Sequence, residues 1–345
     1  MPIVPNLFER FALLKFNQGP GLLLDILGAG AFKAVVLAIK LEVFEVLADS
    51  PLTSSELAHK IKSNEQGTAI LIEFLESFGY VKQSNGEYSN TAMTSRWLLR
   101  KSPSNLADMV RIWDSDIFEF WDKYLEGAVV KGKVPMTIYE WFNKQPDGWR
   151  AFNSFQMAVA RWLGNRIAAN VKLDTAQKIL DVGGGHGMYS IMLCKRYPSL
   201  SATVFDKPEP LETAKENVAA EKMNDRITLH SGDFWVDDLG SGYDGALLFN
   251  LIHNYLPDKN IELLNKVSKA LNPGATIAFF DQLNDMATSP ALKAIVRFFA
   301  LTYWVTVGGH TYSSNDIADW LAKTGFTKPK RVRFVPGLII ATKRR

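Results

Sequence analysis

The chain contains a single cysteine, Cys194, among its 345 residues. One cysteine can form no internal disulfide and no multi-cysteine metal site, so both are excluded. Cys194 ends the apolar run Ile191-Met192-Leu193. This setting indicates a buried helix face rather than a catalytic nucleophile.

An excess of charge of one sign is also missing. The 39 lysines and arginines nearly balance the 36 aspartates and glutamates, for a formal net charge of +3. Such a balance gives no electrostatic reason to expect a nucleic acid or an acidic membrane as partner. Four charged residues interrupt the apolar stretch 32–47, and residues 1–11 lack the pattern of a secretory signal. We therefore expect a cytoplasmic protein with no membrane or nucleic-acid partner.

The length and the 47% share of apolar residues predict two domains with cores of their own. In the first part of the chain, the sequence indicates helices at 32–44, around 53–58 and at 65–78. Asn85-Gly86 then marks the turn of a β-hairpin. Three helices and a hairpin predict a winged-helix-like domain.

Many winged helices bind DNA, so a non-catalytic, ligand-sensing regulator is an alternative function. The helix expected at 65–78 carries Glu65, Glu73 and Glu76 but no lysine or arginine. A helix that enters a groove lined by phosphates should be basic. The charges therefore favour a helical dimerisation domain.

From residue 176 onward, short apolar strands alternate with helices, the pattern of a Rossmann-like, doubly wound α/β domain. The predicted strands are 178–182, 202–205, 227–231, 245–250, 276–282, 331–334 and 338–342. The helical segment before them is rich in aromatic residues that could wall a pocket for a planar substrate. We predict a winged-helix-like domain at 1–103, a helical linker contributing to the substrate pocket at 104–170, and a catalytic domain at 171–345.

A glycine loop follows the first of these strands, with Gly183, Gly185 and Gly187 after Asp181. Glycines let the chain turn sharply and let backbone atoms touch a ligand. A nicotinamide-dinucleotide loop would place its third glycine at residue 188, which is Met188. The pattern therefore indicates a smaller, adenosyl ligand and argues against a dehydrogenase.

Further polar residues follow the neighbouring strands. Asp206 ends the second strand, where a carboxylate can accept hydrogen bonds from both ribose hydroxyls. Asp233 and Phe234, after the third strand, suit the amine and the ring face of adenine. With Asn250, at the end of the fourth strand, they complete the predicted cofactor site.

On the stretches 180–187 and 231–234 the chain resembles the class I methyltransferases. Further matching stretches lie at 204–208, 251–255 and 271–275. They extend the resemblance over nearly the full length of the chain, to the plant-type small-molecule O-methyltransferase family and its bacterial relatives. The resemblance implies S-adenosylmethionine as cofactor and S-adenosylhomocysteine as product. It also implies a homodimer and a small-molecule acceptor for the methyl group.

The resemblance assigns the role of general base to His253, which matches the histidine of a His-Asp-Trp segment. A histidine suits this task because it is largely neutral at physiological pH. Asp281 matches the first of two acids that support the base. The sequence departs from the family at Asn254-Tyr255, at Phe249 in place of a lysine near the cofactor, and at 308–312, which has no acid. A capping or packing role for His253 is the alternative.

The acceptor pocket is expected to include Phe155, Met157, Phe298, Tyr303, Trp304 and His310. His253, Asp281 and His310 are the residue types of a His/His/carboxylate metal site, but they come from separate segments of the chain, and we predict no metal. The predicted function is methyl transfer to a hydroxyl of a small aromatic or polyketide-like molecule. Transfer to carbon or nitrogen is the alternative, because of the departures near His253.

Overall fold

The computed structural model describes residues 8, 16, 22–145 and 147–345. The described chain forms two compact units, divided between Asp114 and Ser115. The segment 1–11, on which the expectation of no secretory signal depends, lies outside the described residues except for Phe8.

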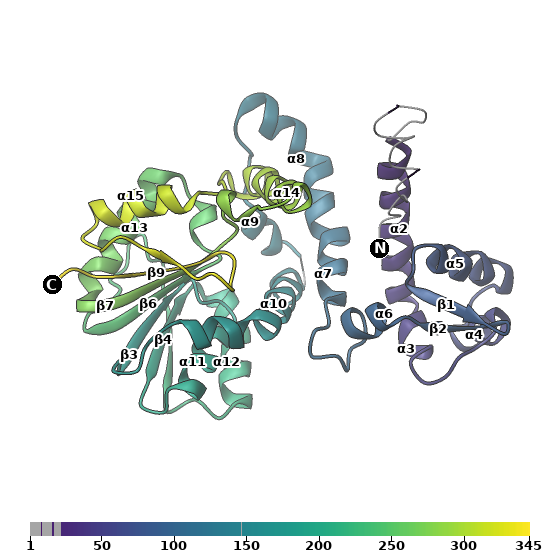
Figure 1. The fold of residues 1–345 in the computed structure, drawn as a ribbon, viewed down its shortest axis with the longest axis horizontal. Helices are drawn as coiled ribbons and strands as arrows, with labels where there is room; N and C mark the ends of the chain where they lie inside the picture. Colours follow the sequence, from purple (N-terminus) through teal and green to yellow (C-terminus); the bar gives the residue numbers. More distant parts are fainter. Residues whose placement is uncertain (1–7, 9–15, 17–21, 146) are drawn as a thin grey trace. The chain divides into compact units, whose positions relative to one another are not determined.

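Among its described residues, the first unit has six helices and a two-stranded hairpin (Figure 1). The helices are α2 (Leu22–Lys40), α3 (Val43–Val46), α4 (Ser54–Lys60), α5 (Glu65–Ser77), α6 (Ala92–Trp97) and α7 (Ala107–Ile112). The hairpin pairs β1 (Val81–Ser84) with β2 (Glu87–Asn90) in antiparallel register. Thr53 and Glu56 form a capping box at the start of α4. The predicted winged-helix-like arrangement is confirmed.

The first long helix differs from the predicted range 32–44. α2 is described from Leu22 and ends at Lys40. Glu42 then has a φ of 61°, in the left-handed region that a right-handed helix cannot include, so a separate helix, α3, begins at Val43. The sequence pattern missed this break because the apolar periodicity continues across it.

The second unit is the doubly wound α/β domain that the sequence predicts. Its sheet has the strand order β5-β4-β3-β6-β7-β9-β8. The first five strands in this order are parallel, and β9 is antiparallel to both β7 and β8. The strands are β3 (Lys178–Val182), β4 (Ser201–Asp206), β5 (Ile227–Ser231), β6 (Tyr243–Phe249), β7 (Leu271–Phe280), β8 (Lys330–Arg331) and β9 (Leu338–Thr342).

Helices precede, connect and cover these strands. Before the sheet come the π-helical turn η2 (Trp113–Ile117), α8 (Phe118–Lys131), α9 (Ile138–Phe142) and α10 (Gly148–Asn170). Between and after the strands come α11 (Met188–Arg196), α12 (Pro208–Ala220), η3 (Ile252–Asn254), α13 (Pro257–Ala270), η4 (Asn284–Met286), α14 (Pro290–Val307) and α15 (Ser314–Lys323).

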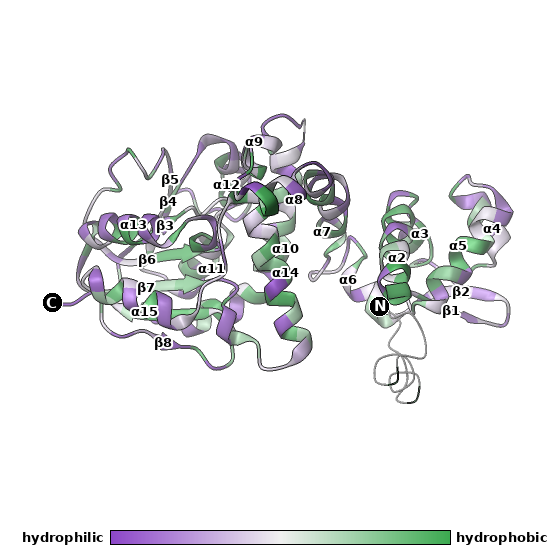
Figure 2. Ribbon diagram, turned by 90° about the horizontal axis from the view of Figure 1, so that it is seen from above, coloured by the Kyte–Doolittle hydropathy of each residue, from purple (hydrophilic) through white to green (hydrophobic). Residues whose placement is uncertain are grey.

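Alternate residues of the strands face two separate cores. Leu180 and Val182 pack with residues of α13 and α15, whereas Ile179 packs with residues of α10, α11 and α12. Helices therefore cover both faces of the sheet (Figure 1), and the central strands β6 and β7 are largely apolar (Figure 2). Cys194 is fully buried in the second core, where burial raises the pKa of its thiol to about 11, so it is no nucleophile.

The predicted strand at 331–334 is wrong in extent, because β8 contains only Lys330–Arg331. The chain then turns back toward β9 through Gly337, whose φ is 88°. Backbone hydrogen bonds from Val332 N to Leu338 O (3.0 Å) and from Leu338 N to Val335 O (3.0 Å) close this turn. The expected antiparallel pair at the end of the chain, β8 with β9, is confirmed.

Two of the described helices, α2 and α14, are long and apolar enough to cross a membrane by length and composition alone. The core helix of a soluble protein passes the same test. In α14, the Trp304 indole donates a hydrogen bond to Ala128 O of α8 (2.9 Å). This contact gives α14 a packing role within its own unit.

Candidate active site

A cavity opens at the carboxyl ends of β3, β4, β5 and β6. The strand order reverses between β3 and β6, and ligands of open α/β sheets bind at such a switch point. Seven of the eight residues predicted to bind the cofactor line the cavity: Asp181, Gly183, Gly185, Asp206, Asp233, Phe234 and Asn250. The eighth, Gly187, caps the start of α11 with a φ of 71°. The fold thus brings together side chains spread over 70 positions of the sequence.

The glycine loop has no room for larger residues at Gly183. Its φ is 67°, and a Cβ there would lie 2.8 Å from Cδ1 of Leu251. The loop is held from two sides: Gly185 N donates to Asp206 Oδ2 (2.8 Å), and Asn217 Nδ2 donates to His186 O (2.8 Å). The backbone of the loop therefore forms one fixed wall of the cavity.

Two carboxylates face this cavity: Asp181 is buried and Asp206 is partly buried. Burial raises the pKa of Asp181 to about 7, although the Ser190 hydroxyl donates to it (2.7 Å). Burial likewise raises the pKa of Asp206 to about 6, against hydrogen bonds from the N–H groups of Lys207 and Gly185. Carboxylates in this condition gain stability from a ligand that brings hydroxyl or ammonium groups.

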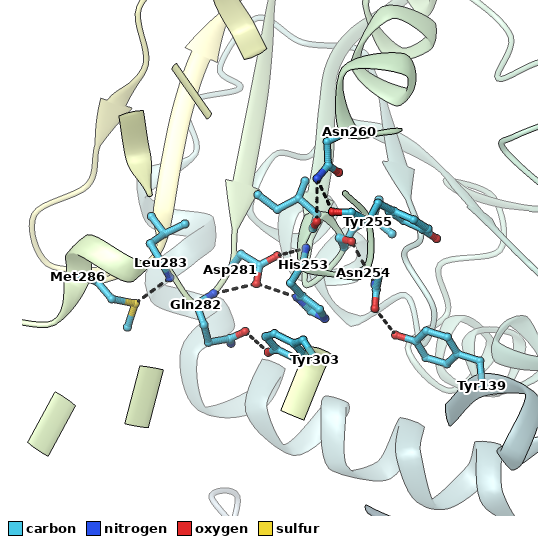
Figure 3. Close-up of polar contacts among 12 residues, drawn as sticks. Tyr139, His253, Asn254, Tyr255, Asn260, Asp281, Gln282, Leu283, Met286 and Tyr303 are labelled. Atoms are coloured by element: carbon cyan, nitrogen blue, oxygen red, sulfur yellow. Dashed lines mark hydrogen bonds and ion pairs between the residues drawn. The ribbon is translucent and has the colours of Figure 1, made fainter. Parts of the chain in front are cut away.

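Aromatic side chains from α9 and the start of α10 form the opposite wall. The rings of Tyr139 and Trp149 stack with centroids 5.6 Å apart and planes at 6°, and Phe152 packs edge-on against both. The Tyr139 hydroxyl donates to Asn254 Oδ1 (3.0 Å; Figure 3). Sequence reasoning did not single out these three residues. The one feature of the sequence that pointed to them was the high proportion of aromatic residues in the segment 104–170.

A second aromatic group surrounds the predicted adenine position. Phe234, Trp235 and Tyr255 all line the cavity. The Trp235 ring lies edge-on to Phe234 at 5.1 Å and to Tyr255 at 4.9 Å. Such flat apolar surfaces suit a planar base.

His253 lies in η3, just beyond the end of β6, and is paired with Asp281 beyond β7 (Figure 3). His253 Nδ1 and Asp281 Oδ1 are 2.8 Å apart, and the same oxygen accepts a hydrogen bond from Gln282 N (2.8 Å). A carboxylate at Nδ1 holds the proton on that nitrogen, which leaves Nε2 as the proton acceptor. The histidine ring is 7% exposed.

The backbone of His253 is fixed by the loop that follows α14. His310 N donates to His253 O (2.9 Å). A Cβ on Gly309 would lie 1.8 Å from the same oxygen, so only glycine fits there.

Tyr303 of α14 covers one face of the His253 ring. The ring centroids are 3.8 Å apart and the planes differ by 11°. The Tyr303 hydroxyl donates to Gln282 Oε1 (Figure 3). Tyr303, predicted for the acceptor pocket, is thus next to the predicted base.

The other residues predicted for the acceptor pocket are more scattered. Phe298 contacts the Trp121 ring of α8 (5.7 Å), and Met157 Sδ accepts from Asn217 Nδ2 (3.0 Å). Phe155 packs on Phe152 (6.5 Å), and His310 Nδ1 bonds Thr311 O. None of the six residues predicted for the acceptor pocket lines the cavity described above. The predicted catalytic residues His253 and Asp281 do not line it either. Within the described residues, no group of three or more His, Cys, Asp or Glu side chains is arranged to hold a metal ion.

Comparison with known families accounts for both units. Residues 105–327 match the O-methyltransferase domain, and residues 26–101 match the O-methyltransferase dimerisation domain. The chain belongs to this O-methyltransferase family.

The relatives of this chain include methyltransferases of bacteria and of vertebrates. The 3-hydroxy-5-methyl-1-naphthoate 3-O-methyltransferase of Streptomyces sahachiroi is 30% identical over 327 residues, or 92% of this chain and 93% of the relative. The L-tyrosine C(3)-methyltransferase of Streptomyces lavendulae is 26% identical over 341 residues, or 94% of this chain and 92% of the relative. The solved structure of human N-acetylserotonin methyltransferase with S-adenosylmethionine has a TM-score of 0.82 at 22% identity, with 100% of both chains covered.

The enzyme is therefore an S-adenosylmethionine-dependent methyltransferase of the O-methyltransferase family. The cavity fits that cofactor chemically. It offers acids for hydroxyl and ammonium groups, flat rings for adenine, and a glycine loop that a Cβ at Gly183 would obstruct. The individual contacts to the cofactor stay a prediction.

The affinity for S-adenosylhomocysteine should fall as the pH drops from 8 to 6. In the free enzyme Asp181, with a pKa of about 7, is mostly protonated at pH 6. A ligand whose ammonium group binds the ionised carboxylate must displace that proton, so linkage makes binding about tenfold weaker at pH 6 than at pH 8. Isothermal titration at both pH values measures the effect, and Asp181→Asn should remove most of it, leaving the smaller effect of Asp206, whose pKa is about 6. An affinity that does not change over this range contradicts the prediction.

Proposed function

We propose that His253 is the general base that takes the proton from the acceptor hydroxyl, with Asp281 as its positioning residue. The observation that carries the proposal is the 2.8 Å contact between His253 Nδ1 and Asp281 Oδ1 at the carboxyl edge of the sheet. A carboxylate at this nitrogen orients the ring and stabilises the imidazolium that forms.

The cofactor would supply the methyl group, and the protein would remove the proton from the acceptor hydroxyl. When bound, S-adenosylmethionine supplies a methyl group on a sulfonium, and its loss leaves a neutral thioether. His253 Nε2 accepts the hydroxyl proton, so the acceptor oxygen loses hydrogen and gains methyl. Tyr303 covers one face of the imidazole and limits the orientations of its ring. Asp206, Asp233 and Phe234, which line the cavity, would hold the adenosyl group when the cofactor is bound.

The test is an activity screen with product analysis. The enzyme is incubated with S-adenosylmethionine and a panel of hydroxylated aromatic acids that includes 3-hydroxy-1-naphthoate. We expect equal amounts of S-adenosylhomocysteine and of a methyl ether, identified by mass spectrometry and NMR. A product methylated on carbon would contradict the proposed base mechanism.

Transfer to carbon is the second candidate. The segment 308–312, where the family carries its second supporting acid, has no acid here. Its Thr311 hydroxyl donates to Asn284 Oδ1 (2.6 Å) and cannot stabilise an imidazolium as an acid does. A relative at 26% identity is named as a tyrosine C(3)-methyltransferase. The NMR spectrum of the product separates the two candidates, because a methyl ether and a ring methyl differ in carbon shift.

We infer that the working form is a homodimer in the cytoplasm, with no nucleic-acid or membrane partner. The dimerisation domain supports a homodimer, and α2 carries exposed apolar residues that a second copy could cover: Leu22, Leu23, Ile26, Leu27 and Leu37. The charge of α5 argues against DNA binding, because this helix contains Glu65, Glu73 and Glu76 and no basic residue. Light scattering after size exclusion tests the dimer, and a gel shift at low salt tests DNA binding.

A further inference from the structure

The hydroxyl of Tyr189 is buried at the cofactor cavity without a partner. Tyr189 is the second residue of α11, directly after the glycine loop, and is one of the residues that line the cavity. Its side chain is 5% exposed, and the hydroxyl makes no hydrogen bond with any residue that the structure describes. Because burying an unpaired hydroxyl is costly, such a group calls for an acceptor that arrives with a ligand.

The rings next to Tyr189 pack against its ring, but none of them forms a hydrogen bond with its hydroxyl. Phe249 packs edge-on against the ring (5.0 Å, 87°), and Phe280 lies 6.4 Å away. His186 lies at 5.8 Å, and its Nδ1 already accepts from Met188 N (3.1 Å). Burial and the charge of Asp181 raise the pKa of Tyr189, so its O–H stays protonated and acts as a donor.

The strand order indicates which end of the cofactor lies beside Tyr189. Asp233 follows β5 and Asp206 ends β4, so adenine and ribose occupy that side of the cavity. Asp181 of β3 and Phe249 of β6 mark the other side, which remains for the methionyl end. Tyr189 contacts this second side, through Phe249.

The methionyl end carries one ammonium and one carboxylate group. The carboxylate of Asp181 suits the ammonium, whereas a carboxylate needs a donor, and Phe249 has none. The N-terminus of α11, where Tyr189 lies, favours an anion as well.

We propose that Tyr189 donates its hydroxyl hydrogen to the methionyl carboxylate of the bound cofactor. The inference rests on the proposed placement of the adenosyl group over β4 and β5. It assigns to a tyrosine on α11 a donor that Phe249, which stands in place of the family's lysine, does not supply.

The test compares two ligands on one variant. Tyr189→Phe removes only the hydroxyl, and 5′-methylthioadenosine is the cofactor product without the methionyl ammonium and carboxylate. Isothermal titration should give a Kd for S-adenosylhomocysteine about tenfold higher in the variant, the loss expected for a hydrogen bond to a charged group. The Kd for 5′-methylthioadenosine should stay within twofold.

Tyr197→Phe is the matched control. The Tyr197 hydroxyl donates to Val171 O (2.9 Å) and does not line the cavity. This control should unfold at a lower temperature with both affinities unchanged. Tyr189→Phe without ligand should unfold at the same temperature as the wild type or higher, since its lost hydroxyl had no partner.

Two results would overturn the proposal: an unchanged affinity for S-adenosylhomocysteine, or an equal loss for both ligands. A folded wild type that binds neither ligand would instead overturn the adenosyl site on which the proposal rests.

Discussion

Replacing His253 with glutamine should lower kcat by about 10²–10⁴-fold, the contribution of a positioned general base. Glutamine keeps a polar side chain of similar size but cannot take up a proton. The Kd for S-adenosylhomocysteine should stay within twofold, because His253 does not line the cofactor cavity. The measurement is steady-state kinetics with the best acceptor from the activity screen, alongside titration calorimetry.

Two variants separate base catalysis from structural damage. Asp281→Asn keeps the shape of the side chain but removes the charge that stabilises an imidazolium, so its kcat should fall by less than that of His253→Gln. His230→Gln is the control: this exposed histidine of β5 stacks on Phe205 (4.8 Å), and its loss should not change kcat. A His253→Gln enzyme that keeps a fifth or more of wild-type kcat would contradict the base mechanism and favour transfer driven by proximity alone.

Replacing Asp206 with alanine should weaken binding of S-adenosylhomocysteine by about 100-fold or more. The variant loses the carboxylate that we expect to accept two charge-assisted hydrogen bonds from the ribose, each contributing about 1.5–3 kcal/mol. It also loses the bond that holds Gly185 N of the glycine loop (2.8 Å). Isothermal titration measures the loss directly.

The Asp206→Ala protein should still fold. Burial raises the pKa of Asp206 to about 6, so ionisation of this group opposes folding at neutral pH, and its removal relieves that cost. Glu209→Ala, an exposed acid three residues later, is the control and should bind normally. Tight binding by Asp206→Ala would mean that the adenosyl group lies elsewhere.

The site residues that could be predicted from the sequence are those that directly follow a predicted strand. Asp181, Asp206 and Asp233 each follow an apolar strand, and in a parallel sheet all strand ends meet at one edge. The glycine pattern after β3 then distinguishes an adenosyl site from a dinucleotide site. No knowledge of distant contacts is needed for either inference.

The parts that sequence could not predict depend on packing between distant segments. Tyr139 meets Asn254 across 115 residues, and Tyr303 stacks on His253 only because α14 packs against α8. No periodicity in the sequence encodes such pairings. The break between α2 and α3 escaped prediction for another reason: one residue, Glu42, adopts a conformation that its type rarely takes.

The contact between Gly309 and the carbonyl of His253 limits how this enzyme can be redesigned. The loop at 308–312 follows α14, whose side chains are the natural targets for changing acceptor preference. Any side chain at 309 would push the histidine backbone away, and insertions nearby would do the same through the bond from His310 N. A library that randomises this loop would therefore lose turnover in most members before any new substrate could be selected. Substitutions intended to change acceptor preference should instead be made in α8 and in the first turns of α14, where side chains can change without moving His253.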